Sequence, residues 1–172
     1  MLPILLLTLA VDCACDPAKP ETMKARECSL CAEAEKQPAG VRVFFLKDIN
    51  PRKPNRWLAL PRRHGSGAHH LHDLTAAERT ELWTAAIAKG KELFGETGWG
   101  VAYNGETVRT QCHTHVHIGR FVPVAEQAKG YIVVTKPAEI PAPPGVGIWV
   151  HPVGGKLHVH LGEQITETVL VR

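Results

Sequence analysis

Three histidines at alternate positions, His113, His115 and His117, are the residues of this chain whose types and spacing best suit chemistry. Alternate side chains of a β-strand project from one face, so the three imidazoles would form a row. The residues between and after them would face a core: Thr114, Val116 and Ile118. Packing does not explain the row, because each buried imidazole needs a partner for its donor and its acceptor. Since imidazole suits metal ions and phosphoryl groups, we expect a metal site, a phosphate site or both, with a solvated strand face as the alternative.

The segment around these histidines is similar to a known family. His113-x-His115-x-His117-Ile118-Gly119 resembles the signature of the histidine triad (HIT) family of nucleotide hydrolases and transferases. The preceding Arg109-Thr110-Gln111 is similar to the CDP-diacylglycerol pyrophosphatase branch. Two further family elements occur in the family's order, Asp48-Ile49 after one expected strand and Pro61-Arg62-Arg63-His64 after the next. The resemblance covers residues 28 to 123.

This resemblance assigns roles to the residues. His115, the middle histidine, would be the nucleophile and His117 would donate to phosphate oxygens. The expected catalytic set is His113, His115, His117, Arg109 and Gln111. Asp48 would accept hydrogen bonds from ribose hydroxyls. The expected nucleotide-binding set is Asp48, Ile49, Arg56, Asn104 and Thr110. Many family members have a fourth histidine at the position of Arg56, and a permanent cation there would favour a more anionic substrate.

A neutral imidazole is a competent nucleophile toward phosphorus. Attack on a phosphoanhydride would give a nucleotidyl-histidine, which water or another acceptor would then resolve. Mg²⁺ is not strictly required if fixed donors hold the charge that develops on the phosphate oxygens.

A pair of cysteines forms a second candidate metal site. Cys28-Ser29-Leu30-Cys31 is ambiguous between zinc, a redox pair and a Cys28–Cys31 disulfide. The resemblance implies a structural Zn²⁺ held by Cys28, Cys31, His64 and His113, a ligand set that suits a closed tetrahedral site. His151, His158 and His160 form a less specific cluster, which we interpret as a mostly solvated strand with an accessory metal role as the alternative.

The composition is that of one ordinary globular domain. The 172 residues are 44% hydrophobic and 22% charged, with a net charge of +3. The basic residues are dispersed and form no stripe, so we expect no nucleic-acid partner. A small positive excess still favours an anionic nucleotide.

The first residues predict a targeting segment. Leu2 to Val11 is apolar but too short for a membrane span of about 20 residues. It is typical of a secretory signal, so we expect an exported or membrane-associated protein, or a cytoplasmic one if the start is misassigned; the alternative is a buried N-terminal strand. Cys13 and Cys15 are assigned to this leader and not to the mature fold.

Periodicity predicts the elements that position the histidines. We expect strands over 41–46, 56–60 and 99–103, and a helix from the Thr75-x-x-Glu78 capping box to Phe94. Asn104-Gly105 predicts a hairpin turn into the histidine strand. Later segments predict a short helical turn over 125–130, a strand over 131–135, a hairpin of 147–153 with 156–161, and a last strand over 164–171.

The expected fold class is α+β, an antiparallel HIT-like meander packed with one capped helix and followed by a β-rich extension. Its parts would be a leader (1–15), a HIT-like domain (26–123) and an extension packed on it (124–172). The expected function is hydrolysis or transfer at a nucleotide phosphoanhydride, with a CDP-diacylglycerol-like lipid nucleotide or a dinucleoside polyphosphate as substrate. The resemblance also implies a homodimer. The alternative is a non-catalytic, zinc-stabilised module that binds nucleotides or metals.

Overall fold

The computed structural model describes residues 11–63, 70–128 and 130–171. It contains one antiparallel sheet with the strand order β1-β2-β4-β3-β6-β7-β5, so the expected α+β class is confirmed. The strands are β1 (Val43–Lys47), β2 (Trp57–Pro61), β3 (Trp99–Tyr103), β4 (Val116–Arg120), β5 (Ile132–Val134), β6 (Ile148–Val153) and β7 (Lys156–Leu161). The α-helices are α1 (Ser29–Glu35) and α2 (Ala76–Phe94). Within the described residues, no helix is long and apolar enough to cross a membrane.

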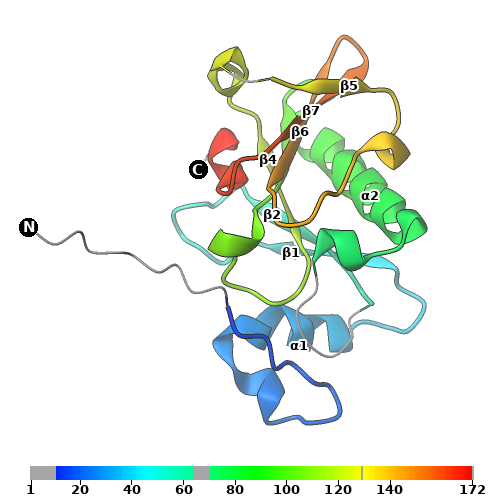
Figure 1. Cartoon of the computed structure of the whole chain (residues 1–172), viewed down its shortest axis with the longest axis vertical. Coiled ribbons are helices and arrows are strands. Elements are labelled where there is room, and N and C mark those ends of the chain that lie inside the picture. The colour runs from blue at the N-terminus through cyan, green and yellow to red at the C-terminus, as the bar shows by residue number, and fades with distance from the viewer. Residues whose placement is uncertain (1–10, 64–69, 129, 172) are drawn as a thin grey trace, which may run out of the picture.

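Helix α2 covers one face of the sheet (Figure 1). It begins with the expected capping box, in which the Thr75 hydroxyl accepts from the Glu78 backbone N–H and the Glu78 carboxylate accepts from the Thr75 N–H. Its buried stripe is Leu82, Trp83, Ala86, Ile87 and Gly90. Gly90 lets the helix approach β3, because a Cβ there would lie only 3.0 Å from the Cβ of Trp99.

The opposite face of the sheet carries the histidines. The strand register places one lateral row on it, Leu58–His117–Ala102–Trp149–His160, running from β2 to β7. The C-terminal segment, with a 3₁₀ turn over Thr166–Val169, packs over the middle of this face, seen in red in Figure 1. Gly100 and Gly119 make room for it, since a Cβ on Gly100 would lie 2.7 Å from the Leu170 Cδ2 and one on Gly119 would lie 3.1 Å from the Leu170 Cβ.

Most expected elements are present with shifts of a residue or two, and two local expectations are wrong. The last strand over 164–171 is the 3₁₀ turn instead, with one isolated bridge between Phe121 and Leu170. Asn104-Gly105 does not form a tight hairpin, because a twelve-residue loop over 104–115 separates β3 from β4 and includes the 3₁₀ turn Glu106–Val108. The 124–172 region continues the same sheet, since β6 pairs directly with β3.

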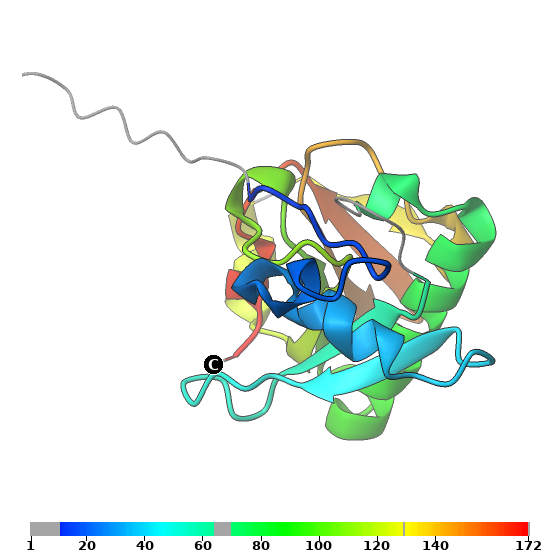
Figure 2. The same ribbon diagram turned by 90° about the horizontal axis from the view of Figure 1, so that it is seen from below.

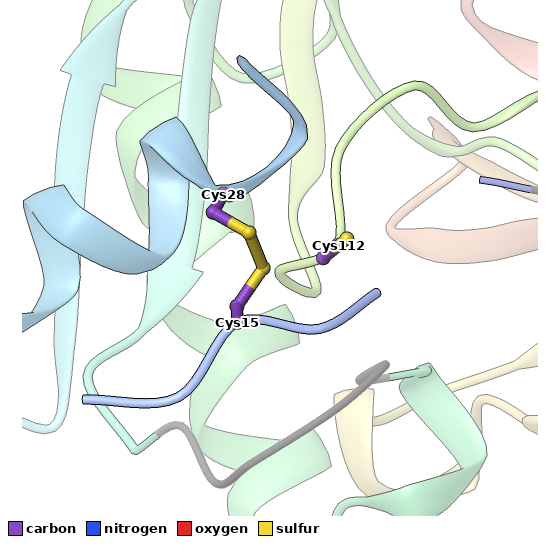
Figure 3. A group of neighbouring side chains, drawn as sticks. All are labelled: Cys15, Cys28 and Cys112. Carbon is purple, nitrogen blue, oxygen red and sulfur yellow. A yellow bond between two sulfur atoms is a disulfide. The ribbon is translucent and has the colours of Figure 1, made fainter. Parts of the chain in front are cut away.

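Two disulfides fix the N-terminal segment, which corrects the assignment of its cysteines to a dispensable leader. Cys13 is bonded to Cys112 and Cys15 to Cys28, while Cys31 is a buried free thiol. Figure 3 shows Cys15 and Cys28 joined beside Cys112. The bonds hold the segment from residue 11 and α1 against the loop that precedes β4, as seen from below in Figure 2. Residues 1–10 of the expected leader lie outside the described residues.

Candidate functional site

A cavity of about 690 Å³ opens on the histidine face of the sheet. Its walls come from α1, the β1–β2 loop, the loop over 104–115, β4 and the C-terminal 3₁₀ turn. His115 and His117 both line it, with ring centroids 5.1 Å apart and ring planes at 74°. The two rings are therefore positioned to act on one ligand.

His113 does not join them among the residues that line this cavity. Its side chain is fully buried, and its Nε2 donates to the Pro61 carbonyl oxygen over 2.7 Å. Regular strand pairing of this segment begins only at Val116, so the alternation expected for three histidines does not reach back to residue 113. Only His115 and His117 of the three histidines therefore line the cavity, whereas His113 connects the segment to the end of β2.

The protonation state of His115 follows from its contacts. Its Nδ1–H donates to the His113 carbonyl oxygen over 2.8 Å, which leaves the lone pair on Nε2. Burial, together with the nearby His117 and Arg109, lowers the pKa of His115 from 6.5 to about 3. The ring is therefore neutral at physiological pH, the state in which an imidazole is nucleophilic.

His117 is also held neutral. Burial lowers its pKa to about 4, although the carboxylate of Glu167 opposes this, and Arg56 and Lys53 add to the lowering. Its Nδ1 lies 3.8 Å from the Glu167 carboxylate.

Glu167 is a site residue that the sequence analysis missed. Burial alone would raise the pKa of its carboxyl, but His117, Lys53 and Arg56 lower it to about 2. Asn104 positions it, because the Asn104 Oδ1 accepts from the Glu167 backbone N–H over 3.1 Å. No local pattern marks Glu167, which lies 50 residues after His117 in the sequence.

Arg56 does not have the expected position among the residues around the nucleotide. It is not one of the residues that line the cavity, and its side chain is 2% exposed. Its guanidinium donates to the Glu167 carboxylate and to the carbonyl oxygens of Glu167, Leu170 and Val171. Arg56 therefore holds the C-terminal segment in place behind the cavity, whereas the cations that line the cavity are Arg26, Lys47, Lys53 and Arg109.

Arg109 and Gln111 line the cavity, but their side chains form hydrogen bonds to other groups of the protein. The Nη2 of Arg109 donates to the carbonyl oxygens of Gln111, Cys112 and His113, and its Nη1 donates to the Tyr103 hydroxyl. These bonds shape the loop that delivers His115. The Gln111 side chain in turn donates to the Arg26 carbonyl oxygen and accepts from the Ser29 hydroxyl, which fixes the start of α1.

The other expected nucleotide-binding residues line the cavity: Asp48, Ile49, Asn104 and Thr110. Asp48 accepts from the Asn50 backbone N–H over 2.9 Å, and Ile49 is 98% exposed at the rim. Apolar side chains lie beside them, including Leu30, Leu46, Leu58 and Val108. The cavity can therefore accept a ligand with charged and apolar parts.

The expected zinc set of Cys28, Cys31, His64 and His113 does not fit this structure. The sulfur of Cys28 is bonded to Cys15, so it cannot serve as a thiolate ligand, and the alternative Cys28–Cys31 disulfide is absent for the same reason. The Nε2 of His113 is occupied by the Pro61 carbonyl. His64 lies outside the described residues.

Two other groups of metal-ligating residues occur within the described residues. One is Cys15, Cys28 and Cys112, all engaged in disulfides. The other is Glu126, His151 and His158. The interpretation of His151, His158 and His160 as a mostly solvated strand is wrong, because these residues are 1%, 9% and 1% exposed.

No protein-family model matches the chain, and no curated protein matches it significantly. The HIT interpretation therefore depends on the residues and geometry described above.

Proposed function

We propose that this chain is a HIT-type phosphoanhydride hydrolase or nucleotidyl transferase that uses His115 as a covalent nucleophile. The observation that carries the proposal is the hydrogen bond from the His115 Nδ1–H to the His113 carbonyl. It leaves a neutral ring with its lone pair on Nε2 in a residue that lines a large cavity. This is the arrangement that attack on phosphorus needs.

The reaction would proceed in two displacements. The His115 Nε2 lone pair forms a bond to phosphorus while the anhydride P–O bond breaks, and its electrons leave with a phosphate or phosphomonoester. Water or another acceptor then attacks the phosphorus, the N–P bond breaks, and the electron pair returns to Nε2. His117 supplies an N–H donor to the phosphate oxygens, and Lys53 brings positive charge to the same cavity.

A lipid-linked nucleotide is the substrate that we favour. The lining combines the charged Asp48 and Lys53 with the apolar Leu46, Leu58 and the exposed Ile49. A substrate with a polar and an apolar part could therefore contact both kinds of side chain in one cavity. The Arg109-Thr110-Gln111 sequence supports the CDP-diacylglycerol-like assignment by resemblance. The disulfides are compatible with the proposed extracytoplasmic location, where such bonds persist.

A non-catalytic nucleotide-binding module is the second candidate. It is favoured by the engagement of Arg109 and Gln111 in hydrogen bonds to the protein, since fewer of their donors remain for a phosphate. Such a module would bind cytidine nucleotides and release no product.

The test compares CDP-diacylglycerol in detergent micelles with a dinucleoside polyphosphate, each with excess EDTA and without it, and follows nucleotide release by chromatography. We expect His115→Ala to lower the rate by at least about 10³-fold, since losses of this order follow removal of a covalent nucleophile. His72→Gln is the matched control, because His72 is a partly exposed histidine that does not line the cavity.

A second readout looks for the intermediate itself. Substrate labelled at the phosphorus that becomes bound to the protein should leave an acid-labile, alkali-stable label on the wild-type chain and none on His115→Ala. Equal product release by both proteins would remove His115 as the nucleophile. Binding of CMP by both proteins without turnover of either substrate would support the module instead.

A further inference from the structure

A second histidine cluster lies on the same face of the sheet, away from the cavity. His151 on β6 and His158 on β7 are direct cross-strand partners, and Glu126 reaches them from the 3₁₀ turn Pro123–Ala128. Nothing in the proposed reaction uses these residues. His160, next to them on β7, is three strands away from His117 in their shared lateral row, a distance of about 14 Å at about 4.8 Å per strand.

The ligand atoms of this cluster converge on one point. The Glu126 Oε1 lies 2.6 Å from the His158 Nδ1 and 3.4 Å from the His151 Nε2, and all three atoms lie within 4.8 Å of one another. A tetrahedral site with metal–ligand bonds of 2.0–2.2 Å separates its ligand atoms by about 3.4 Å. The Glu126–His151 pair already has this separation, and the hydrogen-bonded Glu126–His158 pair would have to widen by less than about 1 Å.

The two imidazoles are held in place by aromatic rings. Phe121 stacks on His151 at a centroid distance of 4.1 Å and 11°, and Tyr131 stacks on His158 at 4.1 Å and 13°. Both histidines are almost fully buried, so their rings cannot turn into solvent. The Glu126 side chain is 30% exposed, which leaves the cluster open to an entering ion.

We propose that Glu126, His151 and His158 bind a divalent transition-metal ion, with Zn²⁺ as the best-suited one. Two imidazoles and a carboxylate are ligands that Zn²⁺ accepts, and three protein ligands leave one position for water. His160, whose Nε2 lies 3.4 Å from the His151 Nε2, and Trp149, stacked on His160, form the wall behind the ion. This site is separate from the expected cysteine-containing one.

The test titrates Co²⁺ and Zn²⁺ into chelator-treated protein whose disulfides are intact, in buffer without reductant, so that no cysteine of the Cys13–Cys112 and Cys15–Cys28 bonds can contribute. Co²⁺ reports tetrahedral coordination through its visible absorption, and elemental analysis gives the stoichiometry. We expect one ion per chain. Glu126→Gln and His158→Gln should each weaken binding by at least about 10–100-fold, the loss that follows even when only an outer partner of a metal ligand is removed.

Two control variants keep the result interpretable. His72→Gln removes a histidine from a different His–Glu group, and His115→Ala removes one from the cavity; both should bind the ion as the wild type does. Circular dichroism verifies that each variant is folded. The proposal is overturned if the wild type binds no ion at micromolar Zn²⁺, or if folded Glu126→Gln and His158→Gln bind the ion as tightly as the wild type does. In either case Glu126 and His158 form only a hydrogen-bonded pair.

Discussion

Replacing Glu167 with Gln should destabilise the protein by about 3 kcal/mol at pH 7. Glu167 forms ion pairs with Lys53 and with Arg56, whose side chain is 2% exposed. Gln cannot balance the charge of the buried guanidinium, and loss of one partner of a buried ion pair typically costs about 3–5 kcal/mol.

The pKa of the Glu167 carboxyl gives a second value for the loss of stability in Glu167→Gln. Its value of about 2, against an ordinary 4.5, corresponds to about 3 kcal/mol at neutral pH, at about 1.4 kcal/mol per pKa unit. Because the side chain is 20% exposed and His117 is neutral above pH 4, this value is an upper estimate. The value from the pKa agrees with the lower end of the range of about 3–5 kcal/mol for loss of one partner of a buried ion pair.

The sign of the pH dependence follows from the lowered pKa. The carboxylate contributes its full stabilisation above pH 4.5, and this contribution is lost as the pH falls from 4.5 toward about 2. Protonated Glu167 resembles Gln, so the wild type and Glu167→Gln should converge in acid. Titrating groups that do not interact with Glu167 are common to both chains and cancel in the difference.

The assay is thermal and urea unfolding of both proteins at pH 7, with urea unfolding repeated at successively lower pH. At neutral pH we expect the melting temperature of Glu167→Gln to be lower by about 6–12 °C, from about 2–4 °C per kcal/mol for a chain of this size. Glu92→Gln is the control, because its ion pair with Lys89 lies on the surface of α2 and its loss should cost less than about 0.5 kcal/mol. A Glu167→Gln deficit that is small at pH 7, or equally large at pH 3, would refute the reasoning.

Three further predictions concern the elements around the site. Thr75→Ala removes the N-cap of α2 and should cost about 1 kcal/mol in urea unfolding, whereas an unchanged midpoint would mean that Glu78 caps the helix alone. The double variant Cys13→Ser with Cys112→Ser opens a cross-link between residues 99 apart, and should cost up to about 5 kcal/mol by the loop-entropy relation; stability equal to wild type would show that packing alone fixes the N-terminal segment. If His115 is the nucleophile, its pKa of about 3 makes the rate of nucleotide release independent of pH between about 5 and 8, and an inflection near 6.5 would contradict the buried, neutral ring.

Much of the fold could be predicted from local patterns in the sequence. The capping box at Thr75 and the apolar stripe of α2 are periodic signals within one element, and the structure confirms the helix end at Phe94. Gly154-Gly155 predicts the turn of the β6–β7 hairpin, and both glycines have positive φ in the structure. Such features are determined by neighbours along the chain, so one sequence is sufficient to predict them.

Long-range partners could not be predicted in the same way. The choice of Cys15 over Cys31 as the partner of Cys28 depends on where the N-terminal segment passes, and no spacing rule encodes that path. Arg56 was expected at the nucleotide because the resemblance places it where many family members have a fourth histidine. The structure instead directs it to the C-terminal carbonyl oxygens, which have no recognisable sequence signal.

The C-terminal segment connects these observations. It places Glu167 beside His117 at the cavity, and it places Leu170 over Gly100, in the middle of the histidine face. The same segment therefore sets the electrostatics of one histidine cluster and separates that cluster from the second one. Since Arg56 fastens this segment through hydrogen bonds to its carbonyl oxygens, the charge at the cavity depends on a residue that no ligand needs to touch.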